Sequence, residues 1–375
     1  MEATRERYDG SISGSSTSGS IREQNDAVGT RRNPFELRHG RRYLRDLPYP
    51  LPCDLAETQR QNLRTLLGNT VFGRPVNAPG ALQRVPQKVL EVGCGGGYWT
   101  ATCHEYFSSL GHPDVSFTGL DIAPIAPDYR KQGMKWRFVQ HDVRLVPLPF
   151  DDGSFDYIMR GRHDRDLGLR LPLADTLAPP AGKNQQDEET ALATGTYSLL
   201  SGTPFAPAQN KYVQDSNSWI SEALDKRKLA PIPCSRIAQL LYQEPDTLCD
   251  VGTRRIAVPL RELNWEKERA ADRKHSRTKS DVNPAPVAKG KGKAGAVESF
   301  LTAEQTALRS TALLTVLQMV ESLEPLLKEV SGKNTEEWSH WWASMMSSLL
   351  DHKGPATGEC LEVGAWWATK RTTSG

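Results

Sequence analysis

The feature that most constrains the fold lies between residues 88 and 109, where an apolar stretch runs into a glycine-rich turn. Residues 88–92 read Lys-Val-Leu-Glu-Val, and residues 93–97 read Gly-Cys-Gly-Gly-Gly. A short apolar run that ends in glycines is typical of a buried strand. Glycine has no Cβ, so a nucleotide-like ligand can lie against the backbone amides of such a turn. A helical stretch follows, and this order favours an α/β fold with a ligand at the turn.

The alternation of strands and helices continues along the chain. We expect a helix at residues 101–110 and further strands at residues 115–120, 136–140 and 155–159. Strands that alternate with helical stretches predict a parallel sheet. The expected fold is therefore α/β, with a mostly parallel, doubly wound sheet.

One carboxylate stands at or near the end of each of the first three strands: Glu91, Asp121 and Asp142. An acid beside the glycine turn would repel a pyrophosphate and favour a cation or an amine. Asp121 can accept both hydroxyls of a ribose, and Asp142 can accept a hydrogen bond from an adenine amino group. Together these groups describe S-adenosylmethionine. The alternative interpretation is that Asp121 and Asp142 only cap helices.

The same residues resemble the motifs of class I methyltransferases. Residues 91–97 are similar to the glycine-rich motif, residues 118–121 to the second motif and residues 140–143 to the third. The Asp-Gly-Ser-Phe-Asp strand of that family has its counterpart in residues 151–158, which contain Asp151, Gly153, Ser154, Phe155 and Asp156. The resemblance implies a Rossmann-like methyltransferase fold with a seven-stranded type of sheet.

A narrower resemblance is to the fungal LaeA-like methyltransferases. It rests on residues 49–54 with Glu57 and Arg60, on residues 120–125, and on residues 257–260 and 363–366 as the last two strands. It covers roughly residues 43–160 and 212–370. It implies that the cofactor S-adenosyl-L-methionine is held by nine residues. They are Glu91, Gly93, Gly95 and Gly97 for the methionine moiety, Asp121 and Ile122 for the ribose, Asp142 and Val143 for the adenine, and Tyr49 closing over the methionine end.

One departure from the family concerns the fifth strand. The Leu-Lys-Pro-Gly-Gly turn that precedes this strand in the family is missing, and residues 161–211 occupy its place with polar, aperiodic sequence. The segment is either an insertion beside a degenerate strand or an error in the gene model. The leading hypothesis is a methyltransferase. The alternatives are a catalytically impaired binding or regulatory module and a nicotinamide-dependent oxidoreductase.

Composition shifts divide the chain into six parts. We expect a disordered basic and Ser-Gly-rich tail at 1–42 and the cofactor-binding half of the domain at 43–160. A low-complexity insertion at 161–211 and the second half at 212–263 follow. A basic linker at 264–300 precedes a helical cover and last strand at 301–375, where a helix over 302–330 should bend near Pro325.

Charge and composition limit the partners. The 47 Lys and Arg residues nearly balance the 45 Asp and Glu residues, which argues against nucleic acid or an anionic membrane as the partner. The six cysteines do not have the spacing of metal ligands. No apolar run is long enough to span a bilayer and no secretory signal is visible, so we expect an intracellular protein, cytoplasmic or nuclear. The acceptor is a small molecule or a protein, and the disordered segments offer a surface for a protein partner. The residues that could serve as a base by type are His104, His141, His163 and Asp164, but no spacing singles one out as catalytic.

Overall fold

The computed structural model describes residues 33–47, 49–160, 171–172, 185–199, 205–228, 234–268, 299, 301–351 and 358–371. The chain divides into two units, Met1–Pro34 and Phe35–Gly375, and every described helix and strand belongs to the second unit. Most of the tail, much of the insertion at 161–211 and the centre of the linker at 264–300 lie outside the described residues.

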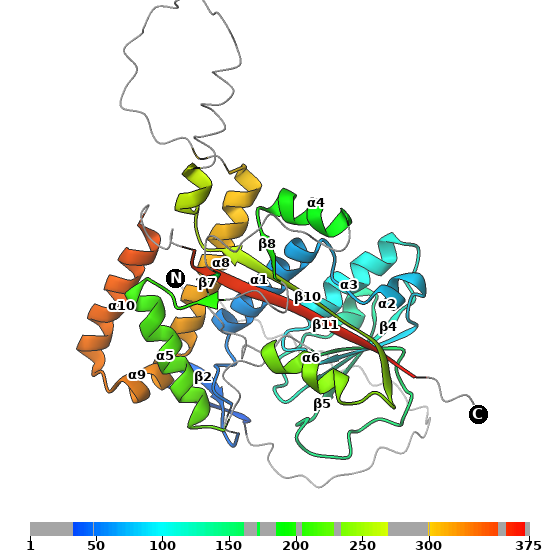
Figure 1. Cartoon of the computed structure of the whole chain (residues 1–375). Helices are drawn as coiled ribbons and strands as arrows, with labels where there is room; N and C mark the ends of the chain where they lie inside the picture. The colour runs from blue at the N-terminus through cyan, green and yellow to red at the C-terminus, as the bar shows by residue number, and fades with distance from the viewer. Residues whose placement is uncertain are drawn as a thin grey trace, which may run out of the picture. The chain divides into compact units, whose positions relative to one another are not determined.

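A parallel sheet of four strands forms the part of the fold that carries the glycine turn (Figure 1). Its order is β5-β4-β3-β6, and every neighbouring pair is parallel. The strands are β3 (Lys88–Val92), β4 (Ser116–Asp121), β5 (Lys135–Gln140) and β6 (Tyr157–Arg160). This arrangement confirms the expected α/β fold with a parallel sheet.

One face of this sheet is covered by α3 (Tyr98–Ser109) and the short helix η1 (Tyr129–Gln132). Val89, Phe117 and Trp136 stand side by side across three strands in register and are buried under these helices. A Cβ added at Gly119 would lie 2.2 Å from the Trp136 ring, so the centre of β4 tolerates only glycine. This packing fixes the glycine turn, which connects β3 to α3, against the sheet.

The strands beyond β6 differ from the seven-stranded expectation. Among the described strands, β6 pairs with β3 alone. The later strands form a separate antiparallel sheet of order β11-β10-β8, made of β8 (Tyr197–Leu199), β10 (Leu248–Pro259) and β11 (Cys360–Lys370). The expected last two strands do pair, with Ile256 opposite Val363. Residues 161–211 lack the alternating apolar side chains of a buried strand, and the described strands within them are short.

Described elements lie across or within three of the expected segments. The hairpin of β1 (Phe35–Arg38) and β2 (Arg41–Leu44) spans the expected end of the tail at residue 42. The expected insertion contains α4 (Gln185–Thr194) as well as β7 (Leu171–Pro172) paired with β9 (Phe205–Ala206). The expected linker starts with a helical stretch at residues 264–268, which includes the buried Glu266.

Helix α1 (Leu55–Phe72) connects the parallel sheet to the rest of the fold. Asp54 caps it by accepting a hydrogen bond from the Glu57 amide at 3.0 Å, and Gly73 ends it with a left-handed φ of 75°. The Glu57 side chain turns inward. It binds Arg60 at 2.6 Å and accepts a hydrogen bond from Ser322 of α8 at 2.8 Å. Helix α1 is thereby tied to α8 by a buried polar contact.

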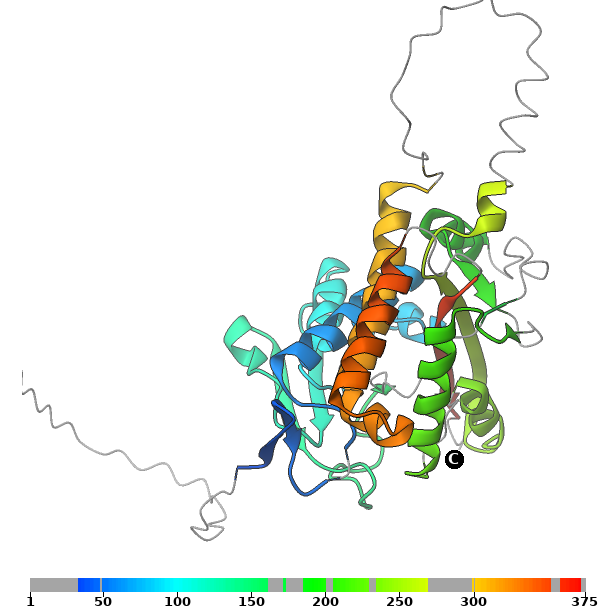
Figure 2. The same ribbon diagram turned by 90° about the vertical axis from the view of Figure 1, so that its left-hand side faces the viewer.

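A layer of helices packs against α1 and the antiparallel sheet. It comprises α5 (Lys211–Asp225), α8 (Ala303–Ser322), α9 (Glu324–Ser331) and α10 (Thr335–Leu350). Figures 1 and 2 show α5, α9 and α10 side by side, and the Trp219 and Trp341 rings meet there at 4.8 Å. The expected bend near Pro325 is confirmed, since α8 ends at Ser322 and α9 starts at Glu324. The remaining helices are α2 (Pro79–Gln83) and α6 (Cys234–Tyr242).

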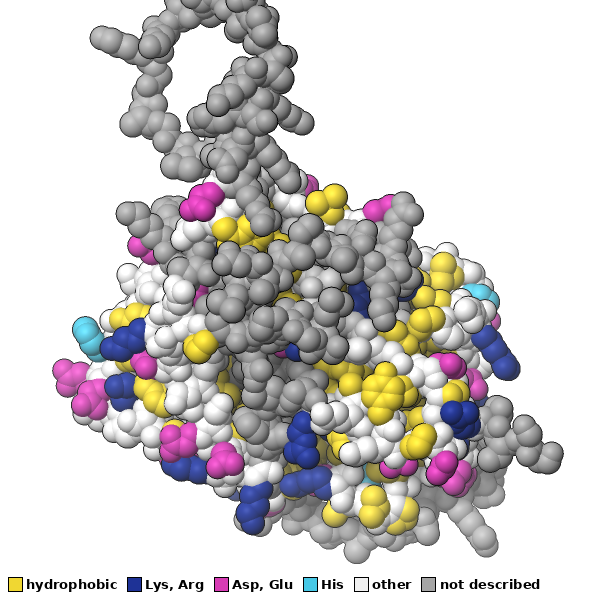
Figure 3. Space-filling model, viewed as in Figure 1, with side chains coloured by type: hydrophobic (Ala, Val, Ile, Leu, Met, Phe, Trp, Pro, Cys, Tyr) yellow, Lys and Arg dark blue, Asp and Glu magenta, His cyan; other side chains and the backbone are white. Residues whose placement is uncertain are grey.

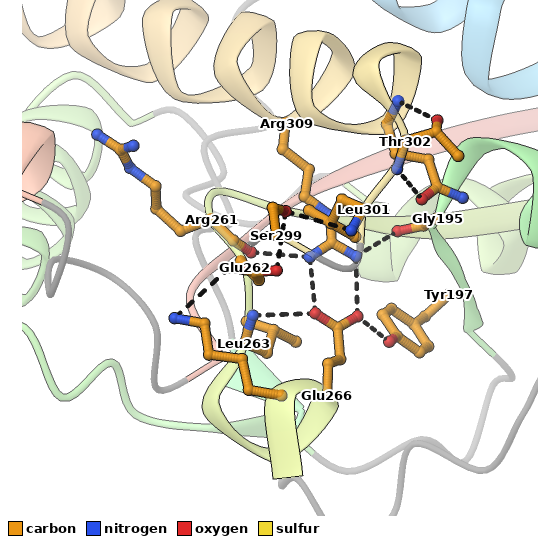
Figure 4. A network of polar contacts seen from close by, with 12 residues as sticks. Gly195, Tyr197, Arg261, Glu262, Leu263, Glu266, Ser299, Leu301, Thr302 and Arg309 are labelled. Carbon is orange, nitrogen blue, oxygen red and sulfur yellow. Dashed lines mark hydrogen bonds and ion pairs between the residues drawn. The ribbon is translucent and has the colours of Figure 1, made fainter. Parts of the chain in front are cut away.

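A buried ion pair between Glu266 and Arg309 of α8 connects the described segments before and after residues 269–298 (Figure 4). Both amino groups of the Arg309 guanidinium contact the Glu266 carboxylate, at 2.7 and 2.8 Å, and they also donate to the carbonyls of Gly195 and Arg261. The Tyr197 hydroxyl donates to the same carboxylate. The pair therefore holds β8, α8 and the start of the linker together.

The surface carries mixed charge, and the face drawn in Figure 3 shows basic and acidic side chains interspersed with hydrophobic ones. In the described part of the chain, no helix has the length and apolar character that crossing a bilayer requires. Nor do His, Cys, Asp and Glu side chains there gather in a group that could hold a metal ion.

Candidate cofactor site

The turn between β3 and α3 has a backbone that only glycine adopts easily. Gly93, Gly95 and Gly97 have φ values of 72°, 52° and 69°, in the left-handed region. The turn is closed by hydrogen bonds from the Gly93 amide to the Leu120 carbonyl and from the Gly97 amide to the Cys94 carbonyl, both 2.7 Å. Gly97 then precedes the first residue of α3. The N-terminal end of a helix thus follows directly on the turn, as anion- and nucleotide-binding turns require.

Both sides of the turn are in close contact with neighbouring elements. A Cβ at Gly95 would lie 2.7 Å from the Gln61 side-chain oxygen of α1. A Cβ at Gly97 would lie 2.7 Å from the Tyr129 ring, whose hydroxyl donates to the Gly96 carbonyl at 2.8 Å. The glycines are therefore needed for packing as well as for access to the backbone.

Glu91 lies on the sheet face that carries α3 and is 4 % exposed. Its Oε2 accepts hydrogen bonds from the Thr100 hydroxyl at 2.7 Å and from the Thr100 amide at 3.2 Å. Burial and, to a smaller extent, the nearby Asp121 raise the pKa of Glu91, the Thr100 hydrogen bonds oppose the rise, and the net pKa is about 8. None of the described residues donates to the other oxygen, Oε1. A cation that reached this oxygen would stabilise the ionised form.

Asp121 ends β4 and binds the backbone on both sides of the site. Its Oδ2 accepts a hydrogen bond from the Gly95 amide at 2.7 Å, and its Oδ1 accepts one from the Ala123 amide at 2.8 Å. Burial raises the pKa of Asp121, and these backbone hydrogen bonds oppose the rise. A carboxylate has about four lone-pair directions, so each oxygen can accept a further hydroxyl. No helix begins at Asp121, so the alternative of a helix cap is wrong here.

Asp142 lies farther out, beyond the end of β5. The Arg144 side chain contacts it at 2.6 Å and holds its pKa below the usual value. The carboxylate also accepts the Arg144 amide at 3.0 Å within a turn, and no helix starts there either. The adjacent Val143 is 41 % exposed. The ends of β4 and β5 are joined by the His141 amide, which donates to the Asp121 carbonyl at 2.9 Å.

Tyr49 and Ile122 belong to an apolar cluster beside the loop that follows β4. Buried Leu44, Cys53 and Ala123 form its centre, and Tyr49 and Ile122 pack against it. The cluster lies on the Asp121 side of the glycine turn. Tyr49 is not among the residues that line the pocket beside Glu91.

A pocket opens between α1 and the glycine turn and holds about 560 Å³ of space, part of it open to solvent. It is lined by Glu91, Gly93, Cys94, Gly96, Tyr98, Trp99 and Met159, and by Gln61, Asn62, Arg64, Thr65 and Asn69 of α1. Asp121 and Asp142 do not line it. Sequence reasoning missed the α1 residues, although their helical spacing marks one polar side of that helix. The pocket lining contains one carboxylate, Glu91, and one guanidinium, Arg64.

Neither of the described histidines with a candidate role as base, His104 and His141, lines this pocket. His104 packs edge-on against the Phe117 ring, and the His141 ring contacts the Leu145 carbonyl at 2.9 Å. His163 and Asp164 lie outside the described residues. The described lining of the pocket thus suits binding and orientation of a ligand more than proton transfer by histidine.

Comparisons with known proteins agree with the glycine turn. Residues 89–164 match the model of a family described as a methyltransferase domain. Methyltransferase str3 of Strobilurus tenacellus is 34% identical over 94 residues, which are 25% of this chain and 30% of that protein. The chain thus matches less than a third of the length of this curated relative.

Two solved structures show a faint likeness. The plantazolicin methyltransferase BpumL in complex with SAH is 18% identical, and the match covers 28% of this chain and 38% of the BpumL chain with a TM-score of 0.21. The SAH-bound methyltransferase PaMTH1 of Podospora anserina is 17% identical, and the match covers 53% of this chain and 83% of the PaMTH1 chain with a TM-score of 0.27. Scores this low add nothing to the argument. The parallel sheet and the glycine turn with its acids lie in or beside residues 89–164, so this part of the chain is similar to a methyltransferase domain.

Proposed function

We propose that this chain binds S-adenosyl-L-methionine at the β3–α3 turn and transfers its methyl group to an acceptor, a small molecule or a protein. The observation that carries the proposal is the pair of carboxylates beside the turn, the buried Glu91 and the half-buried Asp121. Glu91 has an oxygen without a donor among the described residues, and Asp121 is held by the Gly95 amide. The place among the fungal LaeA-like methyltransferases is part of this proposal, and the similar protein from Strobilurus tenacellus is named only as a methyltransferase.

Each part of the cofactor has a proposed partner. Glu91 Oε1 accepts from the ammonium of the methionine moiety, and the Gly93, Gly95 and Gly97 backbone lies beside that moiety. The Asp121 oxygens accept the ribose hydroxyls, with Ile122 and Tyr49 covering this side. Asp142 and Val143, at the outer end of β5, meet the adenine.

The chemistry needs little from the protein beyond alignment. When bound, the cofactor supplies a methyl group on a sulfonium, which is a strong electrophile. The described residues hold it in place, orient it and exclude water from the buried side of the turn. Orientation of two reactants can lower a barrier by roughly 7–11 kcal/mol, so no nucleophile of the protein is required.

A second candidate is a binding or regulatory module that takes the cofactor without turnover. The observation in its favour is the edge of the parallel sheet, because β6 has no described strand on its far side. By contrast, Glu91 disfavours the nicotinamide alternative, since a buried acid at the turn opposes a pyrophosphate.

Calorimetry of the full chain with S-adenosylhomocysteine tests the binding step. Asp121→Ala should weaken the affinity about 10- to 100-fold, because it removes charge-assisted hydrogen bonds. Asp114→Ala is the matched control, since Asp114 is an exposed acid paired with Lys135. An absence of binding by the unaltered chain would refute the proposal, and selective binding of NADH would favour the oxidoreductase.

Transfer of a labelled methyl group into a cell extract separates the enzyme from the binding module. We expect label in a product with the unaltered chain and much less with Asp121→Ala. Cofactor binding without transfer into any fraction of the extract would favour the module.

A further inference from the structure

The β1–β2 hairpin is tied to the segment of the chain that starts helix α1. The Arg41 guanidinium of β2 donates two hydrogen bonds to the Asp54 carboxylate, at 2.5 and 2.8 Å, and the same carboxylate caps α1. The neighbouring Arg42 carbonyl accepts a hydrogen bond from the Cys53 amide at 2.6 Å, and the Arg42 side chain donates to the Cys53 carbonyl at 2.8 Å. A two-stranded hairpin has little stability of its own, so these contacts decide where it lies.

The hairpin also packs on the loop that follows β4, beside Asp121. Leu44, the last residue of β2, is buried together with Cys53 and Ala123 in one apolar cluster. The Ala123 amide donates to Asp121 Oδ1 at 2.8 Å, so a residue buried against the hairpin holds one oxygen of that carboxylate. Burial and then the nearby Asp121 carboxylate raise the pKa of the Cys53 thiol, Arg42 opposes the rise, and the net pKa is about 12. The hairpin, its anchor and Asp121 are therefore close neighbours.

We infer that the hairpin holds Asp121 in the orientation that a ligand needs, and that Arg41 is the positioning residue which fixes the hairpin. This inference rests on the proposed function, in which Asp121 receives the ribose hydroxyls. Arg41 anchors β2 at Asp54, β2 buries Ala123, and the Ala123 amide orients the carboxylate. A binding group must be held within about 0.5 Å of its productive position, and packing of this kind provides the support. Because coupling is reciprocal, a ligand on Asp121 stabilises the docked hairpin in turn.

A double-mutant cycle tests whether Arg41 acts through Asp121. Calorimetry of the full chain with S-adenosylhomocysteine should show that Arg41→Ala weakens the affinity about 5- to 20-fold, and Arg41→Lys should recover part of the loss. In a chain that already carries Asp121→Ala, the further change Arg41→Ala should alter the affinity less than about twofold. Arg227→Ala is the matched control and should leave the affinity unchanged. Arg227 also pairs with a carboxylate of another element, Glu329, and its side chain is 28% exposed against 24% for Arg41.

Hydrogen exchange of the backbone amides gives a measurement that a merely structural role of Arg41 would not move. Saturating S-adenosylhomocysteine should slow exchange in β1 and β2 of the unaltered chain several-fold. Amides of α10, in the helical layer, should change much less. In Asp121→Ala saturated with the same ligand, the slowing in the hairpin should be largely lost.

The outcomes distinguish the inference from the proposed function. If the unaltered chain binds no S-adenosylhomocysteine, both fail. If it binds, and Arg41→Ala keeps the full affinity or loses the same factor with and without Asp121→Ala, only the role of Arg41 is overturned. Should Arg41→Ala fail to fold, exchange in the unaltered chain decides the matter, because a hairpin that the ligand leaves unchanged would overturn the inference.

Discussion

Replacement of Glu91 by glutamine should abolish the pH dependence that this one residue imposes on stability. Glu91 is buried, and burial raises its pKa from the ordinary 4.5 to about 8. The folded protein therefore holds a proton at Glu91 that the unfolded chain releases above pH 4.5. Stability falls with rising pH wherever the native state binds more protons, so Glu91 destabilises the fold progressively between about pH 4.5 and pH 8.

The size of the effect follows from the two pKa values. Each unit of difference corresponds to about 1.4 kcal/mol, and the curve for a single group with these values drops by about 2 kcal/mol between pH 6 and pH 8. The amide side chain of the Glu91→Gln variant would keep an oxygen that accepts from the Thr100 hydroxyl and amide, but it cannot ionise. The variant should therefore lack this drop.

Urea unfolding of the cofactor-free chain at pH 6 and pH 8 measures the difference directly. The free energy of unfolding of the unaltered chain should fall by about 2 kcal/mol more than that of Glu91→Gln over this interval. Thr100→Val is a useful companion, because it removes the hydroxyl that favours the ionised carboxylate. Parallel curves for the unaltered chain and Glu91→Gln would refute the reasoning that Glu91 is held in a water-poor site.

Two further predictions concern packing. Arg309→Met should destabilise the fold by about 3–5 kcal/mol in urea unfolding, because it leaves the buried Glu266 carboxylate without its cation, and adding Glu266→Leu should restore much of the loss. An Arg309→Met variant as stable as the unaltered chain would contradict this prediction. Gly97→Ala should cost about 1–3 kcal/mol more than Gly133→Ala, because both have positive φ but only Gly97 faces the Tyr129 ring. Equal losses at the two glycines would show that the ring gives way.

The parallel sheet could be predicted because its signals are local. Each strand is a short apolar run, and the glycines of the turn leave few other conformations for the chain. The antiparallel sheet is different, because Ala257 of β10 pairs with Tyr197 on one side and Glu362 on the other, both far away in sequence. No local pattern specifies such partners.

The site shows the same division. The position of Glu91 and Asp121 beside the glycine turn could be predicted because they stand at strand ends, and parallel strands bring their ends to one edge. Arg64 could not, because the polar side of α1 looks like any solvent-facing helix surface. Only its packing against the glycine turn, seen at Gln61 and Gly95, turns that side into a wall of the pocket. Helix α4 was missed for a related reason, since its buried Ala191 depends on tertiary packing rather than on a strong helical pattern.

A crystal structure of the full chain soaked or grown with S-adenosylhomocysteine tests the central claim most directly. We predict density for the ligand across the β3–α3 turn, with its ribose hydroxyls on Asp121 and its ammonium on Glu91. Ligand density elsewhere on the molecule, or across the turn with neither carboxylate in contact, would contradict the account.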